Sequence, residues 1–159
     1  MTIYATNGAK LYIGGPLAAK ATDFVLMDFA GQTWVEVGET EGLGSLGDTS
    51  AEIAFEGIAA KRTRRLKGTR NAGTMEVVCG IDYEDAGQIA LLAAGKATGD
   101  YAFQLAFNDA PPGGTHSARF FVAAVGSVVE ALDTANNVMK LNASLWVNSN
   151  VVKVNAEEA

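Results

Sequence analysis

The sequence predicts a mainly β protein: an antiparallel β-sandwich or partly closed barrel with one flanking α-helix. Apolar residues make up 48% of the 159 residues and charged residues 19%, which is typical of a globular domain with a buried core. Stretches of alternating apolar and polar residues recur along the chain, and turns containing Gly or Pro separate them. Because we find neither an internal repeat nor a linker, we expect residues 1–159 to form one domain.

The N-terminal part predicts three strands. In residues 9–14, Leu11 and Ile13 share one face, and the Gly-Gly-Pro sequence that follows ends the strand. Residues 23–29 and 33–39 predict a hairpin, because the three residues between them include a glycine suited to a tight turn.

A long connection over residues 38–73 follows and is unusual for a compact domain. It begins with four glycines in ten residues, which predicts a flexible loop. Residues 51–56 alternate and predict a short strand, although their Ala and Glu also favour a helix. A basic block, residues 61–70, contains six of the twelve Lys and Arg. Six acids lie just before it: Glu36, Glu39, Glu41, Asp48, Glu52 and Glu56.

Residues 86–94 predict the helix. Asp85 is suited to cap its N-terminus, and Gln88 three residues later completes a capping-box pattern. Ile89, Leu92 and Ala93 form an apolar stripe that we expect to lie against a sheet. Gly95 is a natural end for the helix.

One more strand is predicted before this helix in the sequence, and four are predicted after it. Residues 74–83 alternate before it, and residues 101–107 and 138–148 alternate after it. Residues 117–130 are apolar on both faces, as in a strand that is covered on both sides. The valines of 151–154 predict an edge strand, and we expect residues 155–159 to form a short solvated tail.

Charge and cysteine content narrow the functional classes. The net charge is −6, and without the basic block it would be −12, so most of the surface repels nucleic acid. One cysteine excludes an internal disulfide framework. No signal peptide or membrane-length apolar run is apparent, so we expect a soluble protein made in the cytoplasm.

Signals for catalysis or cofactor binding are weak, so we expect neither an enzyme nor a bound cofactor or metal. The glycines of residues 42–47 match a dinucleotide-binding pattern, but the preceding strand is half exposed and no suitable acid follows. We expect His116 to lie on the surface and Cys79 to be a buried structural thiol. Helix capping accounts for the acids at 82–85.

Three interpretations of the basic block remain open. It is a solvated loop, a nucleic-acid patch, or a surface that meets acidic surface on another copy of the chain. The second interpretation lacks interleaved aromatic residues. In the third, ion pairs would set orientation, and apolar contacts would supply affinity, with Trp34 and Trp146 as outward-facing candidates.

The order of these features resembles a known family. Lys10-Leu11-Tyr12-Ile13-Gly14, Trp34-Val35-Glu36-Val37 and Gly42-Leu43-Gly44 come first; Asp85-Ala86-Gly87-Gln88-Ile89 and Leu145-Trp146-Val147 follow the charged segments. This order is similar to that of the tail tube (major tail) protein of long-tailed, non-contractile bacteriophages. The resemblance covers nearly the whole chain, although no single motif is diagnostic.

The resemblance implies a β-sandwich that forms hexameric rings stacked into a hollow tube in the virion tail. It implies a tape-measure protein and tail terminator or tip proteins as partners, and passage of DNA through the lumen. The 38–73 connection matches the loop that reaches the adjacent ring. The contact residues it implies are Leu43, Leu46, Asp48, Glu52, Phe55, Lys61, Arg62, Arg64, Arg65, Lys67 and Arg70. Glu36, Glu39 and Glu76 are expected to face the lumen.

Overall fold

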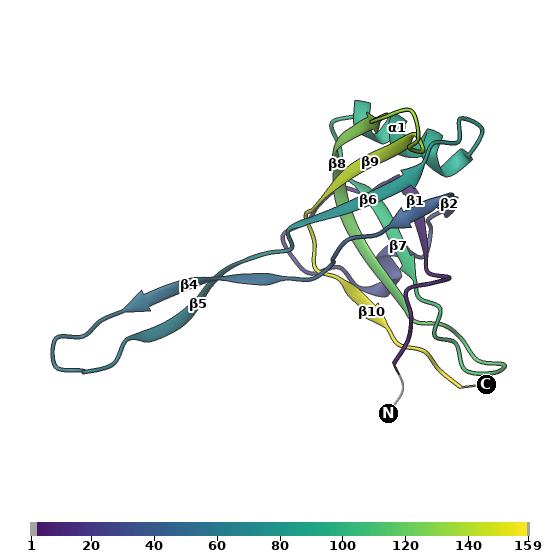
Figure 1. The fold of residues 1–159 in the computed structure, drawn as a ribbon. Helices are drawn as coiled ribbons and strands as arrows, with labels where there is room; N and C mark the ends of the chain where they lie inside the picture. The colour runs from purple at the N-terminus through teal and green to yellow at the C-terminus, as the bar shows by residue number, and fades with distance from the viewer. Residues whose placement is uncertain (1–2, 159) are drawn as a thin grey trace.

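The computed structural model describes residues 3–158 and consists of one large antiparallel sheet, a helix and a projecting two-stranded ribbon (Figure 1). The large sheet runs in the order β2-β1-β7-β8-β9-β6-β3, and β10 pairs with the first residues of β8, before the stretch that pairs with β9. Its strands are β1 Lys10–Pro16, β2 Val35–Val37, β3 Thr40–Gly42, β6 Thr74–Gly80, β7 Tyr101–Ala106, β8 Ala118–Ala131, β9 Lys140–Val147 and β10 Val152–Val154. The helix α1 is Ala86–Lys96, and the ribbon pairs β4 Thr49–Phe55 with β5 Arg64–Asn71.

This architecture confirms the predicted fold class. The sheet curls without closing into a barrel, so that its two halves face each other across a core. Leu11, Val77, Phe103, Phe121 and Leu145 are fully buried in that core. The strands predicted at 9–14, 74–83, 101–107, 117–130 and 138–148 are all present, with boundaries shifted by a few residues. The alternation of residues 138–148 places Met139 on the predicted core face with Leu141 and Leu145, but Met139 precedes β9 and is 46% exposed.

A second, smaller core covers the other face of β7 and β8. Phe24 and Phe29 pack there on Ala102 and Val122, which confirms that β8 is covered on both sides. Trp34, expected to face outward, also packs against this cluster, with its ring centroid 5.8 Å from that of Phe120. Trp146 is exposed, as expected.

The prediction of a hairpin between residues 23–29 and 33–39 is wrong. Leu26–Phe29 is a 3₁₀ turn, and β2 pairs with β1 instead. The Asp28 carboxylate accepts hydrogen bonds from the Val25 backbone N–H at 2.8 Å and from Lys20 Nζ at 2.7 Å. These local bonds compete with a strand ladder, and the turn brings Phe24 and Phe29 into the second core.

The helix begins as predicted but is rotated from the predicted orientation. Asp85 accepts a hydrogen bond from the Gln88 N–H at 2.9 Å, which confirms the N-cap, and the helix continues one residue past Gly95. Leu91 and Ala94 face the core, whereas Ile89 is 52% and Leu92 37% exposed, so the predicted stripe was wrong. Gly87 explains the rotation. Its Cα lies so close to the Glu36 carbonyl and Val37 that a side chain would not fit there.

The Gln88 side chain joins the helix to both ends of the sheet. It does not complete a capping box with Asp85. Its amide nitrogen donates to the carbonyls of Gly38 at 3.1 Å and Gly80 at 2.8 Å, and its oxygen accepts from the Asp82 N–H at 3.0 Å. The side chain is 3% exposed. We call this cluster of Gly38, Gly80, Asp85 and Gln88 the polar joint.

Residues 155–158 were predicted to be a solvated tail, but their backbone forms hydrogen bonds with the domain. Glu157 pairs with Thr115 in an isolated antiparallel bridge, and the Ala156 N–H donates to Ser117 Oγ at 3.0 Å. The Glu157 and Glu158 side chains are exposed, as expected, and Ala159 lies outside the described residues. No helix in residues 3–158 is long and apolar enough to cross a membrane.

We predict that Gly87→Ala destabilises the protein by between about 1 and 3 kcal/mol, because the added Cβ would overlap the Glu36 carbonyl oxygen. Helix propensity alone predicts the opposite, a gain of up to about 1 kcal/mol. Denaturant unfolding measures the difference. Gly99→Ala is the matched control, since nothing lies within 4 Å of its Cβ position. If Gly87→Ala were stabilising, α1 would not lie this close to β2.

Candidate assembly interface

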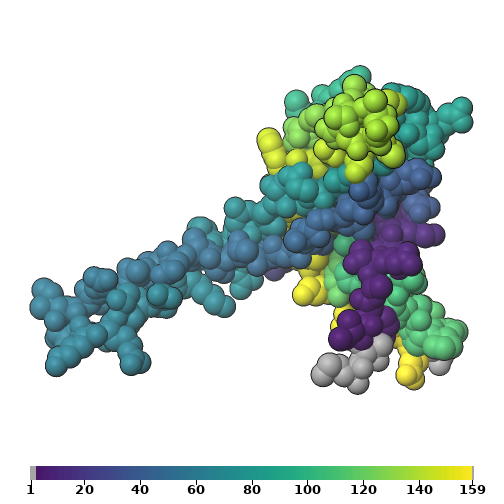
Figure 2. Space-filling model, in the orientation of Figure 1, coloured from purple at the N-terminus to yellow at the C-terminus, as the bar shows by residue number. Residues whose placement is uncertain are grey.

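The connection at 38–73 forms an ordered ribbon rather than a structureless loop. β4 and β5 pair only with each other and extend well away from the domain (Figures 1 and 2). The strand predicted at 51–56 is confirmed as β4, and most of the basic block forms β5. We call residues 49–71 the arm.

The arm is amphipathic. Residues paired across two strands share a face, and successive residues alternate. Ile53 pairs with Leu66, and Phe55 with Arg64, so these four form a largely apolar face. The opposite face holds the intervening pairs, Ala54 with Arg65 and Glu52 with Lys67.

Nothing among residues 3–158 covers the apolar face. Ile53 is 50%, Phe55 59% and Leu66 62% exposed. A two-stranded ribbon is marginally stable alone in water. Its one ion pair among the described residues, Arg65 Nε to Glu52 Oε1 at 3.2 Å, is exposed and adds little. A partner that covers the apolar face would provide the stabilisation that the ribbon lacks.

The apex of the arm combines apolar and basic residues. Ile58 is fully exposed at the tip, and Lys61 and Arg62 follow it without an ion-pair partner among residues 3–158. This end of the arm is therefore suited to a surface that is apolar and acidic.

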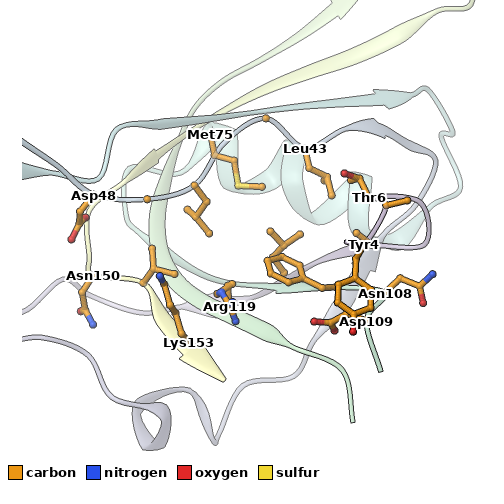
Figure 3. Close-up of a pocket in the computed structure, with 18 of the residues that line it drawn as sticks. Tyr4, Thr6, Leu43, Asp48, Met75, Asn108, Asp109, Arg119, Asn150 and Lys153 are labelled. Atoms are coloured by element: carbon orange, nitrogen blue, oxygen red, sulfur yellow. The ribbon is translucent and has the colours of Figure 1, made fainter. Parts of the chain in front are cut away.

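The base of the arm borders a groove of about 850 Å³ at the open end of the sandwich (Figure 3). Leu43 and Met75 reach into it from one side and Arg119 from the other. Leu43 and Leu46, which the resemblance implies as contact residues, pack against the chain's own core. Asp48 and Arg70 stand exposed at the rim.

Two charged groups at this groove already have partners. Arg119 Nη1 donates to the carbonyls of Ala118 at 2.9 Å and Val154 at 3.2 Å, and its guanidinium lies over the Phe107 ring. Asp109 accepts from the Ser117 hydroxyl at 2.6 Å, and this bond, with one from the Ser117 N–H, lowers the pKa of the Asp109 carboxyl. Both groups thus stabilise the fold around the groove.

The three glutamates expected to face a lumen do not form one cluster. Glu36 lies in β2 with Lys10 Nζ at 3.9 Å, and Glu76 lies in β6 and accepts from Ser144 Oγ at 2.8 Å. Glu39 lies at the bend between β2 and β3, where its φ is 56°. All three are exposed, but β2 and β6 belong to different halves of the sheet.

The residues that the sequence offered as candidates for catalysis or cofactor binding do not form a site. The glycine-rich residues 42–47 lead into β4, with no helix to receive a phosphate, and Gly44 adopts a φ of 64° against the Glu76 backbone. Cys79 is fully buried, and burial, with the nearby Asp85 charge, raises the pKa of its thiol to about 11. His116 is exposed, as expected. Among residues 3–158, no three His, Cys, Asp or Glu are grouped to hold a metal.

Three exposed apolar residues of the arm are absent from the contact residues predicted from the sequence: Ile53, Ile58 and Leu66. For Ile53 and Leu66 the sequence carries a partial signal, which the strand register completes. Ile53 lies in a segment where apolar residues alternate with acids. Leu66 is an apolar residue within the basic block, two residues after Arg64, so the two would share a face of a strand. A strand assignment for 64–71 would have placed Leu66 opposite Ile53.

Several solved structures have the same fold as this chain. In contrast, no family model and no curated protein matches the sequence. The SPP1 tail tube aligns over 94% of this chain and 78% of its own, with a TM-score of 0.62 and 20% identity. The PVC sheath/tube terminator, from an extracellular contractile injection system, aligns over 97% and 98%, with a TM-score of 0.66 and 8% identity. A chain of the anti-feeding prophage baseplate aligns over 98% of both, with a TM-score of 0.65 and 10% identity. The chain therefore has the fold of the SPP1 tail tube, which is shared with components of these two other assemblies.

Proposed function

We propose that this chain is a structural subunit of a phage tail tube. Copies form hexameric rings, the rings stack into a hollow tube, and DNA passes through the lumen. The likeness to the SPP1 tail tube supports the fold of such a subunit. The arm supports self-association, because its exposed apolar face has no partner in the part of the chain that the structure describes.

The charge distribution suits a conduit for DNA. With a net charge of −6, and six of the twelve Lys and Arg on the arm, the body of the protein repels phosphate. A basic lumen would instead retain DNA, since phosphate contacts accumulate affinity. We propose that Glu36, Glu39 and Glu76 contribute negative potential to the lumen. Glu76, on the strand that leads from the arm into the sheet, is the best placed of the three.

Further partners follow from the same proposal. A tape-measure protein would occupy the lumen during assembly, and terminator or tip proteins would bind the ends of the tube. The protein would be made in the cytoplasm of a bacterial host and function in the virion tail. The role is structural rather than enzymatic.

A small nucleic-acid-binding module that uses residues 61–70 is the alternative. The arm gives this function less support, because Arg64 and Arg65 lie on opposite faces and Arg65 is paired with Glu52. The cations therefore do not form the continuous stripe that tracks a phosphate backbone.

Electron microscopy of the purified chain at rising concentration tests the proposal. We expect rings and tubes with a central channel, accompanied by a growing particle mass in light scattering. A particle that stays monomeric at every concentration and binds oligonucleotides with steep salt dependence would support the alternative instead.

We predict that reversing four charges, Lys61, Arg62, Arg64 and Arg65 to Glu, leaves the domain folded but prevents stacking. These residues are exposed on the arm, so their loss costs the core nothing. Unfolding curves check the fold, and sedimentation checks assembly. The matched control exchanges the same four positions between Lys and Arg and should assemble. Normal tubes from the reversed variant would mean that these charges play no part in assembly.

We predict that amides of the arm exchange rapidly in the free subunit and slowly in the tube. The ribbon pairs only with itself and has no core of its own, so it opens locally at low cost. Hydrogen exchange of both states, read on peptides from residues 49–71, measures the change, with β8 as a reference that is protected in both. Strong protection of the arm in free subunits would contradict the prediction.

A further inference from the structure

The outer face of α1 is apolar, although it is exposed. Ile89 and Leu92 lie one turn apart on this face, with Ala86 and Ala93 beside them. The helix contains no charged residue before Lys96. A helix that is apolar all round is normally covered on both sides, but the sheet covers only the face with Leu91 and Ala94. The outer face therefore has no partner among the described residues of its own subunit.

Acidic residues flank this face. Asp82 and Glu84 are exposed beside the N-terminus of α1, together with Tyr83, which is 68% exposed. Neither acid belongs to an ion pair among residues 3–158. The surface is thus an apolar helix face with uncompensated negative charge at one end.

The arm has the complementary properties. Its apolar face, Ile53, Phe55 and Leu66, is bordered by Arg64 and leads to Lys61 and Arg62 at the apex. Arg64, like the apex cations, has no ion-pair partner among the described residues. Each surface offers the charge and the apolar area that the other one needs.

A contact between these surfaces has to join two copies of the chain. In Figure 1, α1 lies at the top of the domain and the arm extends to the lower left, away from the helix. The arm therefore does not fold back onto its own α1. A contact between two different patches of identical subunits is heterologous and repeats into rings or open stacks.

We propose that the apolar face of the arm docks on the outer face of α1 of a second copy, with Arg64 and the apex cations directed toward Asp82 and Glu84. This inference rests on the proposed self-assembly and names the two surfaces that meet. The turn between β8 and β9 also exposes Leu132 and Val138. The helix is the better partner, because its side chains are held at fixed spacing by regular backbone, which lowers the entropy cost of binding.

Disulfide trapping tests the contact in the assembled protein. In a Phe55→Cys/Leu92→Cys variant we expect mild oxidation to link subunits into a ladder on a denaturing gel, in assemblies but not in dilute subunits. Both positions are exposed, so the fold should be unaffected, and the buried Cys79 contributes no cross-links. Phe55→Cys/Met27→Cys and Phe55→Cys/Val138→Cys are the matched controls at other exposed apolar positions.

A charge exchange provides an independent measurement. Arg64→Glu and Glu84→Lys should each raise the concentration needed for assembly about two- to fivefold, and the double variant should restore it. Unrelated contacts would give additive losses in the double variant. Thermal unfolding of the free subunits should be the same for all three.

The outcomes separate this inference from the proposed function. If the unmodified chain forms no rings or tubes, both fail. If tubes form, and the Leu92 pair gives no ladder or the double charge variant is not restored, the inference is overturned while the tube function stands. A ladder through Val138 in place of Leu92 would place the arm on the β8–β9 turn and also overturn it.

Discussion

The polar joint determines the shape of the domain. Gln88 donates to the carbonyls of Gly38 and Gly80, and Asp85 accepts from the N–H groups of Gly38 and Gln88. Gly38 follows β2 at one end of the sheet, and Gly80 ends β6 next to the other end. The Gly80 N–H also donates to the Glu39 carbonyl at 2.8 Å. The joint thus connects both ends of a curled sheet to the first turn of one helix. Because the Gln88 amide is buried, losing either carbonyl partner would leave a polar group without a hydrogen bond.

This joint also fixes where the arm leaves the domain. The chain bends at Glu39, forms β3 against β6, passes over the core with Leu43 and Leu46, and then extends as β4. β5 returns directly into β6. The arm is therefore marginal along its length but firmly held at its base. Such a segment orders on binding at a limited entropy cost, because its direction is already set.

Alternation in the sequence was sufficient to predict most of the sheet, since one face of each strand is buried in the core. It failed at residues 23–29, where Asp28 forms local hydrogen bonds that no alternation pattern reveals. The rotation of α1 could not be predicted either. A helix with Ile89, Leu91 and Leu92 within four residues has no clear polar face, and its orientation depends on the contact of Gly87 with β2. Position and length identified the arm as the candidate site, but its apolar face became visible only with the β4–β5 register.

The distribution of charge explains why the two exposed apolar surfaces, on the arm and on α1, need not cause random aggregation. Without the basic block the chain would have a net charge of −12, so two bodies repel each other unless a basic arm lies between them. Contacts of body on body, such as α1 on α1, bring two surfaces of net negative charge together and are disfavoured. Contacts of arm on body bring opposite charges together. Ion pairs at such a surface add little affinity, so their main effect is to select which apolar faces meet. If the arm docks on α1 as proposed, growth in one orientation follows, because each copy offers one arm and one helix face.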